Sequence, residues 1–146
     1  MRDFTRDDQD AVRELVLDGM RERWGEVYDE TFNPDLDDIW ANHVVAGADV
    51  VVDERDGVIV TVGMLLPEPE GRGRIRRMSV SADHRRLGLG RAMVEELVAR
   101  ARQRGMAEVL VRADTQWTSA VALYERCGFT CTGSDETDTH FSLVLY

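Results

Sequence analysis

The sequence predicts an α/β domain of the α+β type, in which a mixed, mostly antiparallel central sheet contains one parallel β-α-β unit and carries helices on both faces. Runs of β-branched residues alternate with amphipathic helical segments along the chain. The strand–helix–strand segment 74–113 requires two parallel strands joined by a right-handed crossover, whereas strands joined by short turns pair antiparallel. A length of 146 residues fits a single domain, 1–146, with one hydrophobic core.

The first part of the chain is expected to be helical. Apolar residues recur at three- and four-residue spacing over about 8–24 and predict one buried helical face, and Gly25 is expected to end this helix. These apolar residues are Val12, Leu15, Val16, Met20 and Trp24. A second, short helix is predicted near 35–43, with aspartates in its first turn, where the helix dipole favours them.

Three strands are expected next. The β-branched runs 49–53 and 58–66 are joined by a turn that contains Asp56-Gly57, a typical hairpin signal. A turn rich in proline and glycine, 67–73, leads to a third strand, 74–80. These strands are therefore expected to pair antiparallel.

The second half of the chain alternates helices and strands. The remaining predicted elements are a helix over 88–104, a strand over 108–113, a short helix over 118–127 and strands over 129–132 and 140–146. Every fourth residue of the long helix is apolar, and Gly105 supplies its stop. Gly128 is expected to close the short helix in a left-handed conformation, with Phe129 packing back on it.

Composition excludes several classes of protein. The N-terminus lacks the apolar core of a secretory signal, and the longest largely apolar stretch, 58–66, falls far short of the ~20 residues that span a bilayer. Cys127 and Cys131 are expected to be reduced thiols, and the histidines lack the spacing of a zinc site. A net charge of −10 opposes binding to nucleic acid. We expect a cytoplasmic, metal-free protein with neither a nucleic-acid nor a membrane partner.

The charged residues are unevenly distributed. All 18 basic residues are arginine, which fits either a GC-rich genome or an acidic protein adapted to high salt, as in a halophile. The segment 71–91, here called the basic segment, holds seven arginines and one acid, Asp83, so its charge is +6 and the rest of the chain carries −16. The basic segment is the first indication of a binding site for an anion.

The basic segment contains the start of the long predicted helix. A strand ends there, a loop turns, and the helix opens at Gly88 and Gly90. Free N–H groups and the helix dipole attract anions, and glycine lets an anion approach the backbone. Arginines at this end are unfavourable for the isolated helix, but they are favourable if a polyanion binds there. The spacing matches neither the P-loop nor the dinucleotide-binding fingerprint.

Two motifs resemble those of one known family. The run 85–90, Arg-Arg-Leu-Gly-Leu-Gly, resembles the pyrophosphate-binding loop of the GNAT superfamily of acyl-CoA-dependent N-acetyltransferases. The run 120–129, Ala-Val-Ala-Leu-Tyr-Glu-Arg-Cys-Gly-Phe, resembles the later Ala-x-x-Leu-Tyr-x-x-x-Gly-Phe element of the same family. The order of the predicted elements also agrees, so the resemblance covers essentially the whole chain. It implies the acyl-CoA N-acyltransferase fold.

The resemblance implies direct transfer of an acetyl group from acetyl-CoA, the cosubstrate, to a primary amine. Tyr124 corresponds to the general acid that protonates the departing thiolate, and a phenol that is neutral at physiological pH suits this role. Backbone groups of Met78 and Val80 are implied to contact the pantetheine and the thioester. The residues implied in cosubstrate binding are Met78, Ser79, Val80, Arg85, Arg86, Leu87, Gly88, Leu89, Gly90 and Arg91.

The chain departs from the family pattern at two places. Trp117 stands where many members have an asparagine, and no acidic residue occurs between 71 and 82, where many members place a carboxylate as general base. The candidates for the base are Glu26, Asp29, Glu30, Asp114 and His140, and none is singled out. Two other hypotheses therefore stay open. One is a non-catalytic acyl-CoA-binding or regulatory module on the same fold, and the other is binding of an acidic partner through the strand 72–77.

The acceptor is expected, by the same resemblance, beside the connection between the first two helices. The segment 24–35 interleaves acidic and aromatic residues, which suits a cationic amine through ion pairing and cation–π contact. The expected partner is a small-molecule or peptide amine, with a homodimer as a further option for assembly.

Overall fold

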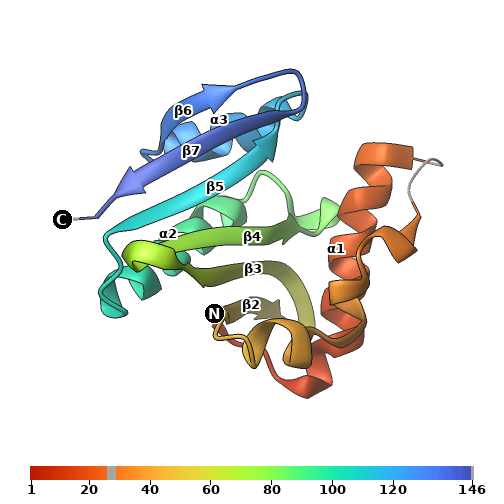
Figure 1. Ribbon diagram of the computed structural model, residues 1–146. Coiled ribbons are helices and arrows are strands. Elements are labelled where there is room, and N and C mark those ends of the chain that lie inside the picture. The colour runs from red at the N-terminus through yellow and green to blue at the C-terminus, as the bar shows by residue number, and fades with distance from the viewer. Residues whose placement is uncertain (26–28, 146) are drawn as a thin grey trace.

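The computed structural model describes residues 1–25 and 29–145 and is shown in Figure 1. Its α-helices are α1 (Gln9–Trp24), α2 (Leu89–Gln103) and α3 (Thr118–Arg126). Its strands are β1 (Arg2–Asp3), β2 (Asp49–Arg55), β3 (Val58–Glu68), β4 (Arg72–Val80), β5 (Glu108–Asp114), β6 (Thr130–Ser134) and β7 (Asp138–Val144). Short helical turns include η1 (Arg6–Asp8), η3 (Glu30–Phe32), η4 (Pro34–Asp38), η5 (Trp40–Val44), η6 (Pro69–Gly71) and η7 (Ala82–His84).

The strands form one 7-stranded sheet in the order β1-β2-β3-β4-β5-β7-β6. β4 and β5 run parallel, and every other pair of neighbours runs antiparallel. α2 connects the two parallel strands, as a crossover requires. The predicted mixed sheet is thus confirmed, and Figure 1 shows α1 on one side of the sheet and α2 and α3 on the other.

Two apolar layers enclose the centre of the sheet. α1, η4 and η5 pack on one face through a core that includes Val12, Val16, Leu17, Leu36, Ile39, Val50, Val52, Val62 and Met64. α2 and α3 pack on the other face through a core that includes Val51, Leu65, Ile75, Met93, Leu97, Val109, Val111, Tyr124, Phe129 and Phe141. Alternate residues of β2 therefore serve opposite layers. Because both faces of the central strands are buried, the runs 50–52 and 58–66 are almost continuously apolar.

The second predicted helix, near 35–43, is replaced by two irregular turns. η4 has the tighter 3-10 winding, and η5 has the wider winding of a π-helix. Asp35 at the start of η4 does not face the solvent as a helix-capping acid would. It is half-buried and bonded to His43 and Arg77. These tertiary contacts override the helical pattern of the local sequence.

The inward face of α1 also differs from the prediction. Val12 and Val16 are buried, but Trp24 at the end of the helix is 46% exposed. Arg23, two helical turns after Val16, is half-buried and takes the inward position instead. A charged side chain therefore ends the apolar stripe of this helix.

Three further features of the described residues bear on function. No helix is both long and apolar enough to cross a membrane in the part of the chain that the structure describes. Over the same residues, no three His, Cys, Asp or Glu side chains are grouped as a metal ion would need. Cys127 and Cys131 are free thiols.

Candidate functional site

β4 and β5 are paired over part of their length and then separate. Residues 72–75 of β4 pair with 108–111 of β5, and beyond these no further pair joins the two strands within residues 1–25 and 29–145. On its other edge, β4 stays paired with β3 as far as Val80. The β5-facing N–H and C=O groups of residues 78–80 therefore have no strand partner in the described structure. An extended ligand with amide groups could pair with this edge.

A β-bulge marks the place where β4 leaves β5. The register of β4 against β3 shifts opposite 62–64, and Arg77 in the bulge has a φ of 55°, which is uncommon for a residue other than glycine. The Arg77 guanidinium donates to both carboxylate oxygens of Asp35, at 2.7 and 3.2 Å. Nε2 of His43 lies 2.8 Å from Oδ2 of the same carboxylate. We call these three residues the Asp35 cluster.

Two of the three side chains of the Asp35 cluster are nearly enclosed, and Asp35 itself is half-buried. The Arg77 side chain is 9% exposed and the His43 side chain 4%. Burial by itself raises the pKa of the Asp35 carboxyl, but the hydrogen bond to His43 and the charge of Arg77 outweigh burial and hold the pKa at about 2. The cluster ties η4 and η5 to the bulge, and so it fixes the point at which the two parallel strands part.

The N-terminus of α2 presents unpaired backbone N–H groups. The helix begins at Gly88, whose φ of 78° is left-handed. The N–H groups of 88–91 have no acceptor within the helix, and none is found for them elsewhere among the residues described. A Cβ added to Gly88 would meet no atom within 4 Å, so the space in front of these groups is open. The N-terminus of α2 therefore offers unpaired N–H groups of the kind that bind anions, and its use as an anion site stays a prediction.

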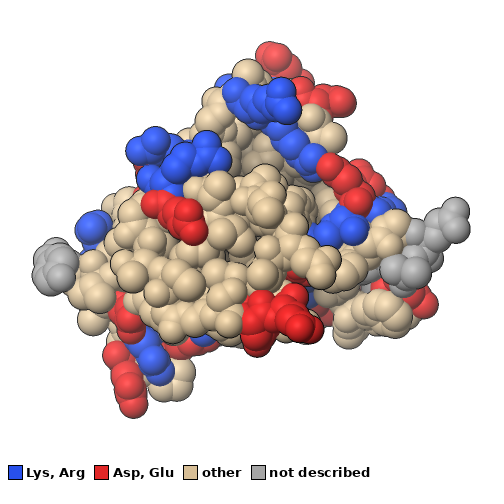
Figure 2. Space-filling model, turned by 90° about the horizontal axis from the view of Figure 1, so that it is seen from above, with Lys and Arg blue, Asp and Glu red and all other residues tan. Residues whose placement is uncertain are grey.

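The positive charge of the basic segment is largely neutralised in the fold. Five of its seven arginines form ion pairs with acids: Arg72 with Glu70, Arg74 with Glu68, Arg77 with Asp35, Arg85 with Glu22 and Arg91 with Glu95. Figure 2 shows one face of the molecule, where basic and acidic side chains lie next to one another around a broad uncharged area. The exposed Arg86, with a φ of 65°, has no ion pair within the described chain. An anion at the N-terminus of α2 would thus meet mainly backbone N–H groups, and Arg86 is an exposed arginine nearby in the chain that has no ion pair with a described residue.

Tyr124 lies in the core between the sheet and α3. Its ring is 5.9 Å from that of Phe129 and 5.8 Å from that of Phe141, measured between ring centroids, and its side chain is buried. Burial raises the pKa of the phenol far above its usual value, and the nearby charge of Arg23 opposes this rise in part. Tyr124 is consequently a neutral hydroxyl over the whole physiological range.

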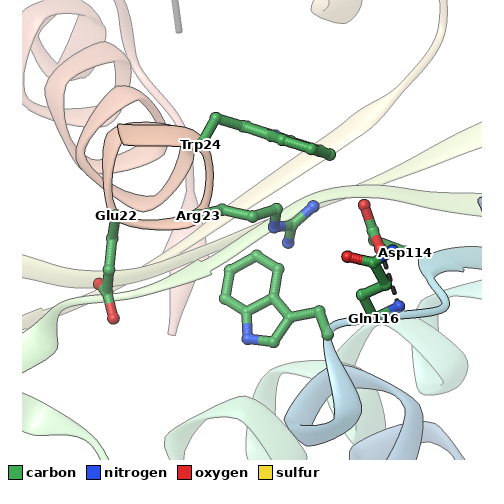
Figure 3. Close-up of a pocket in the computed structure, with 6 residues that line it drawn as sticks. Glu22, Arg23, Trp24, Asp114 and Gln116 are labelled. Carbon is green, nitrogen blue, oxygen red and sulfur yellow. Dashed lines mark hydrogen bonds between the residues drawn. The ribbon is translucent and has the colours of Figure 1, made fainter. Parts of the chain in front are cut away.

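A pocket of about 270 Å³ lies between the end of α1 and the connection from β5 to α3. It is lined by Glu22, Arg23, Trp24, Asp114, Gln116 and Trp117. Figure 3 shows Arg23 and Trp24 reaching from α1 toward Asp114 and Gln116, whereas Glu22 points away from them. Glu22 forms an ion pair with Arg85, which lies in the loop before α2.

Arg23 is the central group of this pocket. Its Cζ lies over the indole of Trp117, 3.2 Å from the ring centroid, and its Nε is buried without a hydrogen-bond acceptor among the described residues. Burial lowers the pKa of the guanidinium, and the charge of Asp114 opposes this change. Trp117, which replaces the asparagine expected from the family pattern, thus serves as a platform for Arg23.

The pocket contains one of the predicted candidates for the general base. Asp114 lines it, and Oδ1 of Asp114 accepts a hydrogen bond of 2.9 Å from the backbone N–H of Gln116. Asp29 is engaged with Thr31, and His140 lies on the exposed surface of β7. Glu26 and the side chain of Glu30 lie outside the described residues. Asp114 is therefore the strongest candidate within the described structure.

The sequence did not identify Arg23 or Gln116 as part of a site. Gln116 follows β5 without a motif around it. Arg23 carried a detectable signal, because helical periodicity places it on the same stripe as Val12 and Val16, where a charged residue is unexpected. A charged residue on the buried stripe of an amphipathic helix is therefore a candidate site residue.

Solved structures define the class of this fold. An acetyltransferase of the GNAT family from Staphylococcus aureus superposes with a TM-score of 0.89 at 16% identity, covering 99% of this chain and 98% of that one. The PaiA N-acetyltransferase of Thermoplasma acidophilum, solved in complex with coenzyme A, superposes with a TM-score of 0.86 at 12% identity, covering 99% and 97%. The chain therefore has the acyl-CoA N-acyltransferase fold, as predicted.

Comparison of sequences identifies the family. Residues 10–129 match the model of the acetyltransferase (GNAT) family, so the chain belongs to this family. N-acetyltransferase 8 of Homo sapiens is 32% identical over 116 residues, which are 75% of this chain and 51% of that protein. The chain spans about half the length of the curated relatives it matches.

Proposed function

We propose that the protein, as the single domain 1–146, is an N-acetyltransferase that moves the acetyl group of acetyl-CoA directly to a primary amine. The observation that carries the proposal is the open N-terminus of α2 beside the unpaired edge of β4, in a chain of the GNAT family. The name of human N-acetyltransferase 8 and the coenzyme A bound to the Thermoplasma protein support it.

The chain offers two sets of groups to acetyl-CoA. The N–H groups of 88–91 and the guanidinium of Arg86 would hold the pyrophosphate in the open space in front of Gly88. The exposed Leu87 completes this loop, and Arg85 would add its charge after leaving Glu22. The β5-facing backbone of Met78, Ser79 and Val80 would pair with the amides of the pantetheine.

The reaction needs an oxyanion donor, an acid and a base from the chain. Acetyl-CoA supplies a thioester whose carbonyl carbon forms a C–N bond with the amine as the C–S bond breaks. A backbone N–H near Met78–Val80 would stabilise the oxyanion. Tyr124 would give its phenolic proton to the leaving thiolate. Asp114 would accept the proton that the attacking amine releases, directly or through a water molecule.

The second candidate function is a non-catalytic acyl-CoA-binding or regulatory module. Trp117 in place of an asparagine and the lack of a carboxylate on β4 favour it. The carboxylate of Asp114 in the pocket favours the enzyme, because it offers a proton acceptor from β5 instead.

Two measurements on the same protein separate the candidates. Thermal shift with CoA tests cosubstrate binding, and thiol release from acetyl-CoA over a panel of polyamines, amino acids and peptides tests transfer. We expect CoA to raise the unfolding temperature and at least one amine to release thiol above the hydrolysis rate. Stabilisation without release from any amine would favour the binding module. Failure of CoA to stabilise the protein would overturn the cosubstrate site itself.

A further inference from the structure

We infer that the pocket at the end of α1 receives the acceptor, and that this acceptor carries a carboxylate close to its amine, as an α-amino acid does. The inference rests on the proposed function and adds the chemical class of the substrate. It is carried by Arg23 and Asp114, which bring opposite charges to one cavity of about 270 Å³ without forming an ion pair with each other in the described structure.

Arg23 is a positioned guanidinium that lacks an anion. It is stacked on the indole of Trp117, and its Nε is buried with no acceptor among the residues that the structure describes. Taking a charged group out of water is costly unless an opposite charge or a hydrogen-bond acceptor replaces the water. The stack holds the planar guanidinium in one orientation, and such a group binds a carboxylate through two parallel hydrogen bonds.

Asp114 supplies the opposite charge on the same cavity. Its Oδ1 accepts the N–H of Gln116, while its Oδ2 accepts no hydrogen bond from any described residue. Figure 3 shows the Arg23 side chain extending toward Asp114. A molecule with both an ammonium and a carboxylate would satisfy the two groups together, whereas a polyamine would leave Arg23 facing a like charge.

The pocket also lies next to the group proposed as the general acid. Trp117 lines the pocket and immediately precedes α3, the helix that carries Tyr124. Asp114 is the last residue of β5, beyond the part of the strand that pairs with β4. An amine held by Asp114 would therefore lie where the two strands separate and where the thioester is expected. By contrast, Asp35, one of the acids behind the expectation of a purely cationic acceptor, already binds His43 and Arg77.

The experiment compares acceptors that differ in the carboxylate. Thiol release from acetyl-CoA is measured with a panel of α-amino acids, their amides and the amines that lack the carboxyl carbon, for example L-phenylalanine, L-phenylalanine amide and phenethylamine. The wild-type protein is expected to prefer the amino acid. Because the amide also changes the basicity of the amine, the decisive quantity is how the ratio of the two kcat/KM values changes between wild type and variant.

Two variants of Arg23 and one control complete the design. Arg23→Gln is expected to lower kcat/KM for the amino acid by about 10- to 100-fold, as the loss of a charge-assisted contact predicts, and to leave the amide within about threefold. Arg23→Lys, which keeps the charge but not the stacked plane, is expected to restore part of the preference. Arg21→Gln, on the exposed side of α1, is the matched control and is expected to behave as wild type. Unfolding midpoints show whether each variant is folded.

Each outcome decides the inference. An equal loss for amino acid and amide in Arg23→Gln, a loss of CoA affinity in that variant, or wild-type preference for amines without a carboxylate would overturn it while leaving the proposed function intact. If no amine is acetylated, calorimetry with the same amino acids in the presence of CoA still tests the pocket. Binding that requires Arg23 would support the pocket and contradict the enzyme, and the absence of binding would contradict both.

Discussion

At the scale of single residues, the proposed cosubstrate site depends on Gly88 having no side chain. Gly88 has a left-handed φ of 78°, and a Cβ on it would project into open space. That space is the one proposed for the pyrophosphate, so any side chain there competes with the ligand. Gly105, beyond the other end of α2, has a φ of 72° and equally open surroundings. The two glycines therefore form a matched pair.

Gly88→Asp is expected to abolish the thermal shift that CoA produces, because it places a side chain and a negative charge at the anion site. Gly105→Asp carries the same backbone strain of about 1 kcal/mol and is expected to keep the CoA shift. Thermal unfolding of both variants with and without CoA checks the prediction. Equal CoA shifts in the two variants would remove the α2 N-terminus from the cosubstrate site.

Tyr124→Phe is expected to lower kcat by about 100-fold or more, the usual contribution of a general acid. The affinity for CoA and the unfolding midpoint should stay unchanged, because phenylalanine keeps the ring contacts with Phe129 and Phe141. Steady-state kinetics with the best acceptor and CoA titration measure the two effects. Wild-type turnover in the variant would exclude Tyr124 from the chemistry.

Individual residues were predictable where their chemistry is local in the sequence. Gly88 and Tyr124 belong to short motifs, so their neighbours along the chain mark them as candidate site residues. Arg23 and Asp114 are far apart in sequence and line one pocket because α1 ends beside the end of β5. A single sequence shows no such proximity, although the charge on the inward stripe of α1 hints at it.

At the scale of elements, β4 determines where the site opens. The strand pairs with β5 as far as Ile75 and then continues with β3 alone among the strands described. The bulge at Arg77 lies where β4 separates from β5. The Asp35 cluster binds this bulge to η4 and η5. The irregular turns before β2 therefore contribute to the position of a strand edge that lies far from them in sequence.

The Asp35 cluster is expected to make stability depend on pH in the acid range. Because the folded pKa of about 2 lies below the ordinary 3.8, the carboxylate contributes stability above about pH 4 and loses it as the pH falls through 2. The shift corresponds to no more than about 2.5 kcal/mol. In urea unfolding near pH 6, the free energy of unfolding of wild type should exceed that of Asp35→Asn by this amount. The difference should shrink as the pH falls toward 2. Asp37→Asn, at an exposed neighbour, is the control, and a gap that does not change with pH would contradict the prediction.

Most elements were predictable because hydrophobic periodicity alone decides them. α2 and β5 agree with their predicted bounds to within one residue at each end, since apolar spacing and a terminal glycine fix them. The segment 35–43 was wrong as a helix, because the Asp35 side chain is used in tertiary contacts that its aspartate-rich sequence does not reveal. β1 has two residues, too few to leave a pattern.

At the scale of the whole molecule, most arginines of the basic segment form ion pairs with acidic residues instead of forming a separate positive surface. The sequence places +6 on the basic segment and −16 elsewhere, which is a strong separation of charge along the chain. In the fold, acids distant in sequence, such as Glu22 and Asp35, pair with that segment and neutralise most of its charge. What remains is a net charge of −10 on the surface, which repels itself at low ionic strength.

Salt is expected to stabilise the protein if the acidic surface is an adaptation to high salt. The Debye length falls from about 30 Å at 0.01 M to about 3 Å at 1 M, which screens repulsion between unpaired acids more than attraction within the half-buried Asp35 cluster. Urea unfolding at increasing NaCl, with equal concentrations of sucrose as the control, measures the change. If the protein is fully stable at low salt, the absence of lysine is better explained by a GC-rich genome.

The ion pair between Glu22 and Arg85 joins the two proposed ligand sites, with Nη2 and Oε2 2.6 Å apart. Glu22 lines the pocket proposed for the acceptor, and Arg85 lies in the loop proposed for the cosubstrate. A phosphate that draws Arg85 away would leave a free carboxylate at the edge of the pocket, where it attracts an ammonium group. By thermodynamic linkage, each ligand would then tighten the binding of the other by the same factor. Binding of acetyl-CoA and binding of the acceptor would thus favour each other through the exchange of partners by a single arginine.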